Sequence, residues 1–354
     1  MKNSISTSAL SVPGSRIREL AEIAMSMDGV LKLYFGECDV PTPEFLQEAA
    51  RKAMADGYTY YTENAGLPST REALAQYYER IHGLKLDPTS EIAVTGSGVQ
   101  ALSLSLRLLV DPGDEAIVLT PAWPNGAAIL RMAHAKVHEI PQVLRGHRYA
   151  IDFEALERAV NPRTRVLLYT SPSNPLGWVA TDEDQTRLLE FARRHRLWLV
   201  ADEVYERLFY LGDIVPTILR KATREDSVIV VQSFSKAWCM TGWRLGWLVA
   251  PKKFIEKAGP LNEFFISCAS SFVQKAAEVA LRDGEGWIRS LVAHLRGNRD
   301  FALAALRKMP GVIVPEPDGA FYLFPRIDGA QDSFAFAKRL LEETKVGLAP
   351  GMAF

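Results

Sequence analysis

Short apolar segments alternate with helical stretches along the middle of the chain, and this alternation restricts the fold more than any other feature of the sequence. Runs of four or five mainly apolar residues stand at 91–95, 116–119, 166–169, 197–201, 228–231 and 245–249. Helical patterns, such as the one over 182–195, separate several of these runs. Strands of a parallel sheet are covered by helices on both faces and therefore read as continuous apolar runs. The sequence predicts an α/β fold with a mainly parallel sheet sandwiched by helices.

The sequence on either side of this region predicts a second, smaller α+β domain. A chain of 354 residues is longer than the roughly 250–300 residues that one core usually supports. Helical patterns and short apolar runs follow the sheet region at 262–282, 286–308, 311–314, 320–324 and 333–344. Before it come an amphipathic stretch at 16–27, a loop at 35–43 and helices at 44–55 and 69–82, the first with Thr42 as its N-cap. We expect a large domain over 45–285 and a small domain built from 1–44 and 286–354.

The charge balance and the cysteine positions exclude several classes of protein. Lys and Arg number 41 and Asp and Glu number 42, so the net charge of −1 favours neither nucleic acid nor an anionic membrane as a partner. Cys38, Cys239 and Cys268 lack the spacing of a disulfide framework or a zinc site. The sequence shows neither a signal-peptide core nor an apolar stretch of about 18 residues. We expect a soluble cytoplasmic protein without a metal.

Four polar segments follow the predicted strands, at the edge where open α/β sheets bind their ligands. They are Gly96-Ser97-Gly98, the run over 171–177 that holds Asn174, the run over 202–205 and the run over 233–244. Each also has an ordinary structural explanation. A tight turn explains the first, an Asx turn the second and an N-cap at Asp202 the third, while the lysine of the fourth could be a solvated surface residue.

Taken together, these segments carry an unusual set of chemical groups. Backbone N–H groups after Ser97 suit a phosphate, and the carboxylate of Asp202 at a buried strand end requires a positive partner. Lys236 lies among serines, tryptophans and Arg244, and a desolvated amine has a lowered pKa and can act as a nucleophile. Pyridoxal 5′-phosphate (PLP) needs a lysine, a carboxylate facing its pyridine nitrogen and a phosphate cradle. The set matches this cofactor.

At this point the chain resembles the class I/II aminotransferases of the aspartate aminotransferase fold, which is PLP-dependent fold type I. The resemblance runs from about residue 33 to residue 354. The motifs that carry it occur in the family's order: Tyr61 with Gly66-Leu67-Pro68 and Arg71, Pro121-Ala122-Trp123, Asn174-Pro175-Leu176-Gly177, Asp202-Glu203-Val204-Tyr205, and Ser235-Lys236 with Thr241-Gly242-Trp243-Arg244-Leu245-Gly246.

The resemblance implies a role for each of these positions. Lys236 would form the internal aldimine with PLP, and Asp202 would keep the pyridinium nitrogen protonated. Tyr205 and Asn174 would hydrogen-bond the phenolic oxygen of the ring, on which Trp123 would stack. The phosphate would be bound by Ser97, Gly98, Val99, Ser233, Ser235 and Arg244.

The resemblance also implies an assembly and a substrate loop. Tyr61 matches a family tyrosine that reaches the phosphate site of the neighbouring subunit, which implies a homodimer with shared active sites. Its alternative explanation is a core aromatic beside Tyr58 and Tyr60. Gly36 matches the loop that approaches the substrate carboxylate, to which Trp123 and Asn174 would also contribute. The family's carboxylate-binding arginine would lie beyond Phe354. Either a C-terminal segment is missing from this sequence, which we expect, or the protein lacks this anchor and would not be a normal transaminase.

The sequence therefore predicts a PLP-dependent aminotransferase of amino-acid metabolism. An L-amino acid would give its amino group to a 2-oxo acid, 2-oxoglutarate being the expected acceptor, by ping-pong kinetics. One alternative is a lyase on the same scaffold, such as a cysteine-S-conjugate β-lyase or a cyclopropane-forming synthase. Another is a non-catalytic PLP-sensing domain of a transcription regulator, which the short N-terminus and the near-zero net charge disfavour. The donor amino acid is left open.

Overall fold

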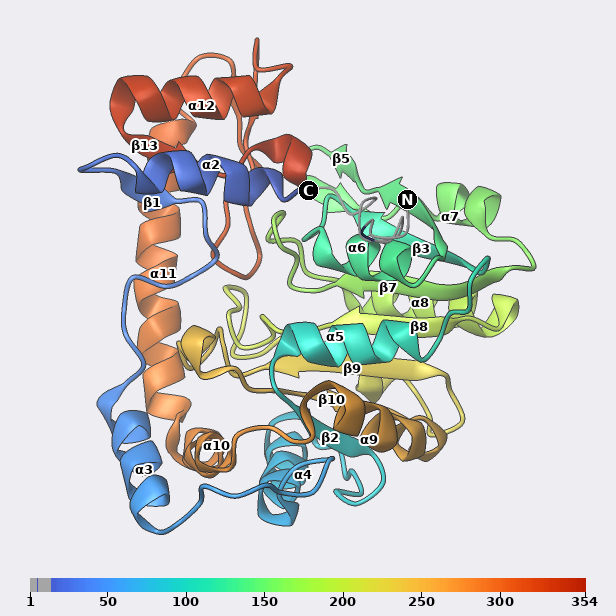
Figure 1. The fold of residues 1–354 in the computed structure, drawn as a ribbon. Helices are drawn as coiled ribbons and strands as arrows, with labels where there is room; N and C mark the ends of the chain where they lie inside the picture. The colour runs from blue at the N-terminus through green and yellow to red at the C-terminus, as the bar shows by residue number, and fades with distance from the viewer. Residues whose placement is uncertain (1–4, 6–13) are drawn as a thin grey trace.

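The centre of the computed structural model, which describes residue 5 and residues 14–354, is a seven-stranded sheet (Figure 1). The strands lie in the order β2-β10-β9-β8-β7-β3-β4. Their bounds are β2 Ile92–Thr95, β10 Gly246–Val249, β9 Val228–Ser233, β8 Trp198–Asp202, β7 Thr164–Thr170, β3 Glu115–Thr120 and β4 Lys136–Pro141. All six apolar runs of the sequence are strands of this sheet. The predicted α/β class is confirmed.

Strand direction decides which loops can meet at the site. The pairs β9-β8, β8-β7, β7-β3 and β3-β4 are parallel, so the carboxyl ends of these strands share one edge of the sheet. Strand β10 is antiparallel to both of its neighbours, and its first residue, Gly246, pairs with Thr95 and Ser233. The loops that follow β2, β7 and β8 and the loop that joins β9 to β10 therefore lie at the same edge.

Helices cover both faces of the sheet, and each face has its own apolar core. On one face pack α5 (Gly98–Arg107), α6 (Asn125–Met132) and α9 (Lys252–Ile266). On the other pack α4 (Pro68–His82), α7 (Phe153–Ala159), α8 (Asp182–His195) and α10 (Ser271–Asp283). Because each strand contributes side chains to both cores, the strands read as continuous apolar runs.

The prediction of one helix over 262–282 is wrong, because α9 ends at Ile266 and α10 begins at Ser271. Ser267 has φ 63° and ψ −66°, a conformation that a helix cannot continue. The connecting backbone is then fixed from α10, since Gln274 Nε2 donates to the carbonyl oxygen of Ala269 at 2.9 Å. This break turns the chain between two helices that cover opposite faces of the sheet.

The remaining elements gather beside the sheet, around the long helix α11 (Glu285–Leu306) (Figure 1). Helix α2 (Arg16–Met25) and helix α12 (Ser333–Thr344) bury a separate small core that includes Leu20 and Leu341. Strands β1 (Leu31–Leu33) and β13 (Val346–Leu348) pair in parallel, and β11 (Val312–Ile313) pairs with β12 (Arg326–Ile327). Helix α3 (Glu44–Ala55), the hairpin of β5 (Val143–Arg145) with β6 (Arg148–Ala150), and three 3₁₀ turns, at Ile218–Arg220, Thr241–Trp243 and Gly351–Ala353, complete the described elements.

The apolar run at 320–324 does not form a strand. Its start is instead bound to the loop after β8, because Ala320 N donates to the carbonyl oxygen of Leu208 at 2.8 Å and Phe209 pairs with Gly319. This contact carries Tyr322 to the carboxyl edge of the main sheet. In the part of the chain described, 5 and 14–354, no helix has the length and apolar character to cross a membrane.

Candidate active site

Lys236 lies in the loop between β9 and β10, with its amino group among groups from distant parts of the chain. Its Nζ donates to the carbonyl oxygen of Gly36 at 2.7 Å and lies 5.5 Å from the ring centroid of Tyr205. Burial lowers the pKa of Lys236. The negative charges of Cys38, Glu37 and Asp202 oppose this shift only in part. An amine with a lowered pKa is a better nucleophile and base at neutral pH.

Asp202 is the last residue of β8 and is only 6% exposed. Its backbone oxygen accepts from Ser171 N at 3.0 Å, and its Oδ1 accepts from Val204 N at 3.3 Å. Burial raises the pKa of Asp202 to about 6, against the opposing effects of the Val204 N–H and the charge of Lys236. A buried carboxyl group held in this way favours a positively charged partner.

Trp123 lies beside this carboxyl group, and Asn174 is bound to Trp123 through the backbone. Trp123 N donates to the carbonyl oxygen of Asn174 at 3.0 Å, which ties together the loops that follow β3 and β7. Trp123, Thr170 and Asp202 line a cavity of about 10 Å³. Asn174 Oδ1 is buried and has no hydrogen-bond partner among the described residues. Leaving such an atom unpaired costs about 1–3 kcal/mol, so the site fits a ligand with polar groups.

The start of α5, where a phosphate cradle is expected, packs closely against the neighbouring strands. Ser97 is the N-cap, and its Oγ accepts from Gln100 N at 3.1 Å. A Cβ at Gly98 would lie 2.9 Å from Ser233 Cβ, and a Cβ at Gly246 would lie 2.5 Å from Gly98 N. Only glycine fits at either position, which brings Gly98 against the end of β9. Val99 is the next residue of this helix. The first N–H groups of a helix have no partner within it and favour an anion.

Ser233, Ser235 and Arg244 complete the set expected at this cradle. Ser233 Oγ accepts from Ser235 N at 3.1 Å and donates to the carbonyl oxygen of Leu245 at 3.4 Å. Arg244 is exposed, and its guanidinium donates to the carbonyl oxygen of Thr241. Arg244 and Gly96 line one side of a larger cavity of about 660 Å³. Of the residues expected to bind the phosphate, Arg244 lines this cavity.

Tyr61 is not brought into this site within the single chain. It is 86% exposed and Tyr60 is 83% exposed, so the alternative that Tyr61 is a core aromatic is wrong. Thr62 N donates to Cys268 Sγ at 3.3 Å, and Cys268 lines the larger cavity together with Arg244. The segment that carries Tyr61 thus runs next to this cavity while its aromatic side chains point to solvent.

Two features of the site were missed from the sequence. Tyr322 Oη lies 2.5 Å from Tyr205 Oη, and a Cβ at Gly36 would lie 2.2 Å from Tyr322 Oη. The aromatic run at 320–324 was the available signal, but it was read as part of the small domain. Thr42, in turn, is not the N-cap of α3: Pro43 is, and Thr42 Oγ1 donates to the carbonyl oxygen of Cys239 at 2.6 Å. The loop before α3 is therefore bound to the lysine loop.

Comparison with known proteins gives the same assignment along the chain. The family model for aminotransferase class I and II matches residues 28–354. The aspartate aminotransferase of Pyrococcus horikoshii is 34% identical over 353 residues, which cover 99% of this chain and 89% of the relative. The aromatic-amino-acid aminotransferase 2 of Thermococcus litoralis is 33% identical over 343 residues, 96% of this chain and 88% of the relative.

Solved structures agree with the sequence relatives. The aspartate aminotransferase from Thermus thermophilus with maleate superposes with a TM-score of 0.90 at 34% identity, covering 99% of this chain and 92% of that chain. The aromatic aminotransferase from Pyrococcus horikoshii superposes with a TM-score of 0.88 at 33% identity, covering 94% and 90%. With the family model matched over nearly its whole length, the chain belongs to the class I and II aminotransferases and is a PLP-dependent aminotransferase.

Proposed function

We propose that this aminotransferase moves the amino group of an L-amino acid to 2-oxoglutarate by a ping-pong mechanism centred on Lys236. The observation that carries the proposal is the convergence of the Lys236 amine with the buried Asp202 carboxyl group, the Tyr205 phenol and the Asn174 amide. These groups come from loops after three neighbouring strands. The mechanism requires the same residues to serve two half-reactions, which is the basis of ping-pong kinetics.

The residues of the site fit PLP, which when bound supplies a conjugated ring that accepts electrons from the substrate's α-carbon. Asp202 would face the pyridine nitrogen and favour its protonated form, because a buried carboxylate is stabilised by a positive partner. Tyr205 and Asn174 would bind the phenolic oxygen, and Trp123 would lie against the ring face. The start of α5, with Ser97, Gly98 and Val99, would hold the phosphate together with Ser233, Ser235 and Arg244.

Lys236 would have two functions in turn. Its Nζ would hold the cofactor before the substrate arrives, and the free amine would then accept the proton from the substrate Cα. The lowered pKa of Lys236 supports the second function, because a base must be neutral to accept a proton. The hydrogen bond to Gly36 orients Nζ toward the loop where we place the substrate carboxylate.

Gly36, Trp123 and Asn174 would form the substrate end of the site. The position of Gly36 is fixed by Tyr322, whose hydroxyl fills the space that a side chain would need. The backbone of this loop can therefore approach a ligand closely. The relatives named above are called aspartate and aromatic aminotransferases, so the candidate donors are dicarboxylic and aromatic amino acids.

We also propose a homodimer in which Tyr61 reaches the phosphate of the partner's site. Two neighbouring tyrosines that are more than four-fifths exposed, beside a cavity lined by Arg244, support this assignment. Large exposed aromatic side chains are typical of interfaces.

The division into a large domain over 45–285 and a small domain of 1–44 with 286–354 stays a proposal. The separate core between α2 and α12 supports it.

A donor panel tests the proposed reaction. The purified protein, saturated with PLP, is incubated with 2-oxoglutarate and one amino acid at a time, including aspartate, phenylalanine, tyrosine and alanine. We expect glutamate and the matching 2-oxo acid in equal amounts, with parallel double-reciprocal plots for the best donor. Release of ammonia and pyruvate from a cysteine conjugate, without glutamate, would instead support a lyase.

A further inference from the structure

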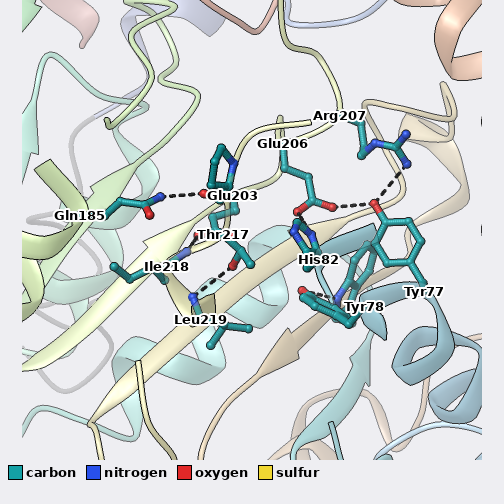
Figure 2. A network of polar contacts seen from close by, with 12 residues as sticks. Tyr77, Tyr78, His82, Gln185, Glu203, Glu206, Arg207, Thr217, Ile218 and Leu219 are labelled. Carbon is teal, nitrogen blue, oxygen red and sulfur yellow. Dashed lines mark hydrogen bonds and ion pairs between the residues drawn. The ribbon is translucent and has the colours of Figure 1, made fainter. Parts of the chain in front are cut away.

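A buried polar cluster lies behind the candidate active site, on the side of the sheet that α4 covers. Its members are Tyr77, His82, Glu206, Arg207 and Glu285 (Figure 2 labels the first four). No step of the proposed reaction uses any of them. We propose that this cluster positions Asp202 and Tyr205 by fixing the turn that follows Asp202 and carries Tyr205; the proposal rests on the cofactor roles assigned to these two residues.

Glu206 is the centre of the cluster. Tyr77 Oη donates to Glu206 Oε1 at 2.7 Å, and His82 Nε2 lies 3.2 Å from Glu206 Oε2 (Figure 2). Both oxygens of the carboxyl group are therefore bound by side chains of α4. Tyr77 is 0% exposed, and the side chains of His82 and Glu206 are 1% and 3% exposed. Hydrogen bonds to a buried carboxylate are stronger than those at the surface, so they hold Glu206 in one orientation.

Arg207 extends the cluster to the next helix. Its Nη1 donates to Tyr77 Oη at 3.3 Å, and its two terminal nitrogens donate to the two carboxylate oxygens of Glu285 at 2.9 and 2.7 Å. Glu285 is the first residue of α11. The two-point geometry of an arginine–carboxylate pair fixes direction as well as distance. The turn is therefore bound to two helices at once.

The backbone transmits this anchoring to the active site. Glu206 N donates to the carbonyl oxygen of Glu203 at 2.9 Å, and Leu208 N donates to that of Tyr205 at 2.8 Å. Tyr205 belongs to both of these overlapping turns, and its hydroxyl lies at Tyr322. The next side chain, Glu206, lies against α4. A shift of the Glu206 carboxyl group would move the backbone on which Tyr205 is carried. Misplacing a catalytic group by about 1 Å can lower a rate about 100-fold.

Stability alone does not require these residues. Replacing a buried ion pair with apolar side chains of similar volume is often neutral or stabilising, because desolvation offsets the attraction between the charges. The contacts of the cluster do fix where the turn lies. Tyr77 and His82 bind Glu206 in the turn, and Arg207 binds Glu285 at the start of α11. The members of the cluster are therefore positioning residues, which act on Asp202 and Tyr205 through Glu206.

Neighbouring tyrosines of α4 provide a matched test in the holoenzyme. Tyr77 and Tyr78 are both 0% exposed, but Tyr78 Oη accepts from Trp247 Nε1 at 3.3 Å and has no hydrogen bond to Glu206. Tyr77→Phe and Tyr78→Phe each remove one buried hydroxyl. We expect Tyr77→Phe to lower kcat about 10-fold with KM for the amino acid changed less than 3-fold. Tyr78→Phe should leave kcat within 2-fold of the unsubstituted enzyme.

The absorbance of the lysine-bound cofactor, titrated against pH, gives a readout that does not depend on turnover. Because Asp202 and Tyr205 would contact the cofactor ring, Tyr77→Phe should shift the midpoint of this titration by at least half a pH unit, and Tyr78→Phe should not. Equal midpoints and equal kcat values for the two variants, whatever their melting temperatures, would overturn the positioning role.

A second pair of variants keeps the test decisive if Tyr77→Phe folds poorly. His82→Gln retains a donor toward Glu206, whereas His82→Leu does not. We expect His82→Gln to keep at least half of the kcat and an unshifted titration midpoint. His82→Leu should have a lower kcat and a shifted midpoint. Identical behaviour of the two variants would overturn the proposal. Failure of the proposed function is distinguishable, because the unsubstituted enzyme would then form no glutamate in the donor panel.

Discussion

The amino group of Lys236 donates a hydrogen bond of 2.7 Å to the carbonyl oxygen of Gly36, a residue 200 positions earlier in the chain. This contact joins the lysine loop between β9 and β10 to the loop that precedes α3. Thr42 makes a second link between the same loops through the carbonyl oxygen of Cys239. The proposed base and the proposed carboxylate loop are thus held together by contacts within the chain.

Gly36→Ala should lower kcat/KM about 10- to 100-fold, because the new Cβ would lie 2.2 Å from Tyr322 Oη. The double variant Gly36→Ala with Tyr322→Phe removes that oxygen and leaves the nearest ring atom at 3.2 Å. Steady-state kinetics of the four proteins in this cycle measure the coupling. We expect the double variant to be more active than Gly36→Ala alone; strictly additive losses would show that Tyr322 does not restrict this position.

Asp202→Asn should change stability and activity in opposite directions. Burial raises the pKa of Asp202 from 3.8 to about 6, so this group stabilises the fold below about pH 4 and loses that contribution as the pH rises through 6. The loss amounts to at most about 3 kcal/mol at neutral pH, at 1.36 kcal/mol per pKa unit.

Asparagine has no charge to desolvate, so the cofactor-free Asp202→Asn protein should unfold at a higher temperature than the unsubstituted protein at pH 8. Its turnover with PLP should fall by about 100-fold or more, because the protonated ring loses its anionic partner. Calorimetry and single-turnover kinetics check the two effects. A variant with near-normal turnover would remove Asp202 from the mechanism.

Glu203→Gln should stabilise the protein increasingly as the pH rises. Burial, together with the charge of Glu206, raises the pKa of Glu203 to about 8. A carboxyl group with a raised pKa loses its stabilising effect between its unfolded and its folded pKa, here from about pH 4.5 to about pH 8. Glutamine can still accept the hydrogen bond that Ile218 N donates to Glu203 Oε1 at 2.9 Å.

Urea unfolding at pH 6, 7, 8 and 9 measures this effect. The stability difference between Glu203→Gln and the unsubstituted protein should grow by about 2–3 kcal/mol from pH 6 to pH 8 and then level off. Gln185, a neutral residue of α8 that is also buried, offers a control through Gln185→Met, whose effect should not depend on pH. A constant difference for Glu203→Gln across this range would show that Glu203 is ionised in the folded protein at pH 6.

Mixed dimers test the proposed shared site. When Tyr61→Phe chains are combined with Lys236→Ala chains, one site of each mixed dimer carries both substitutions and the other carries neither. The intact site should restore activity above the average of the two parent homodimers, and PLP should be retained in about half of the sites. Activity that follows the parental average, or a fully active monomer, would contradict the exchange of Tyr61 between subunits.

Local signals in the sequence were sufficient for many of the elements. Helices at 44–55, 182–195 and 333–344 have the predicted bounds. The capping box of α8, in which Thr181 and Asp184 bind each other's backbone N–H, is local to the chain. By contrast, β4 was not predicted, since this edge strand is partly exposed and does not read as an apolar run.

The fold alone made the candidate site predictable where its residues stand at the ends of strands of the main sheet. Asn174, Asp202 and Lys236 could be placed from their motifs because strand ends share one edge of the sheet. Tyr322 could not, because it reaches Tyr205 through a contact between segments 117 residues apart. The break at Ser267 depends on one backbone conformation that serine rarely adopts, so no pattern in the sequence predicts it.

The covalent attachment of PLP at Lys236 is the claim on which the proposed mechanism depends. Reduction of the PLP-saturated protein with borohydride, followed by proteolysis and mass spectrometry, locates the attachment directly. We predict a phosphopyridoxyl group on the peptide that contains Lys236 and no labelled peptide from Lys236→Ala. A phosphopyridoxyl group on another lysine, or labelling that persists in Lys236→Ala, would contradict the assignment of Lys236 as the cofactor-binding base.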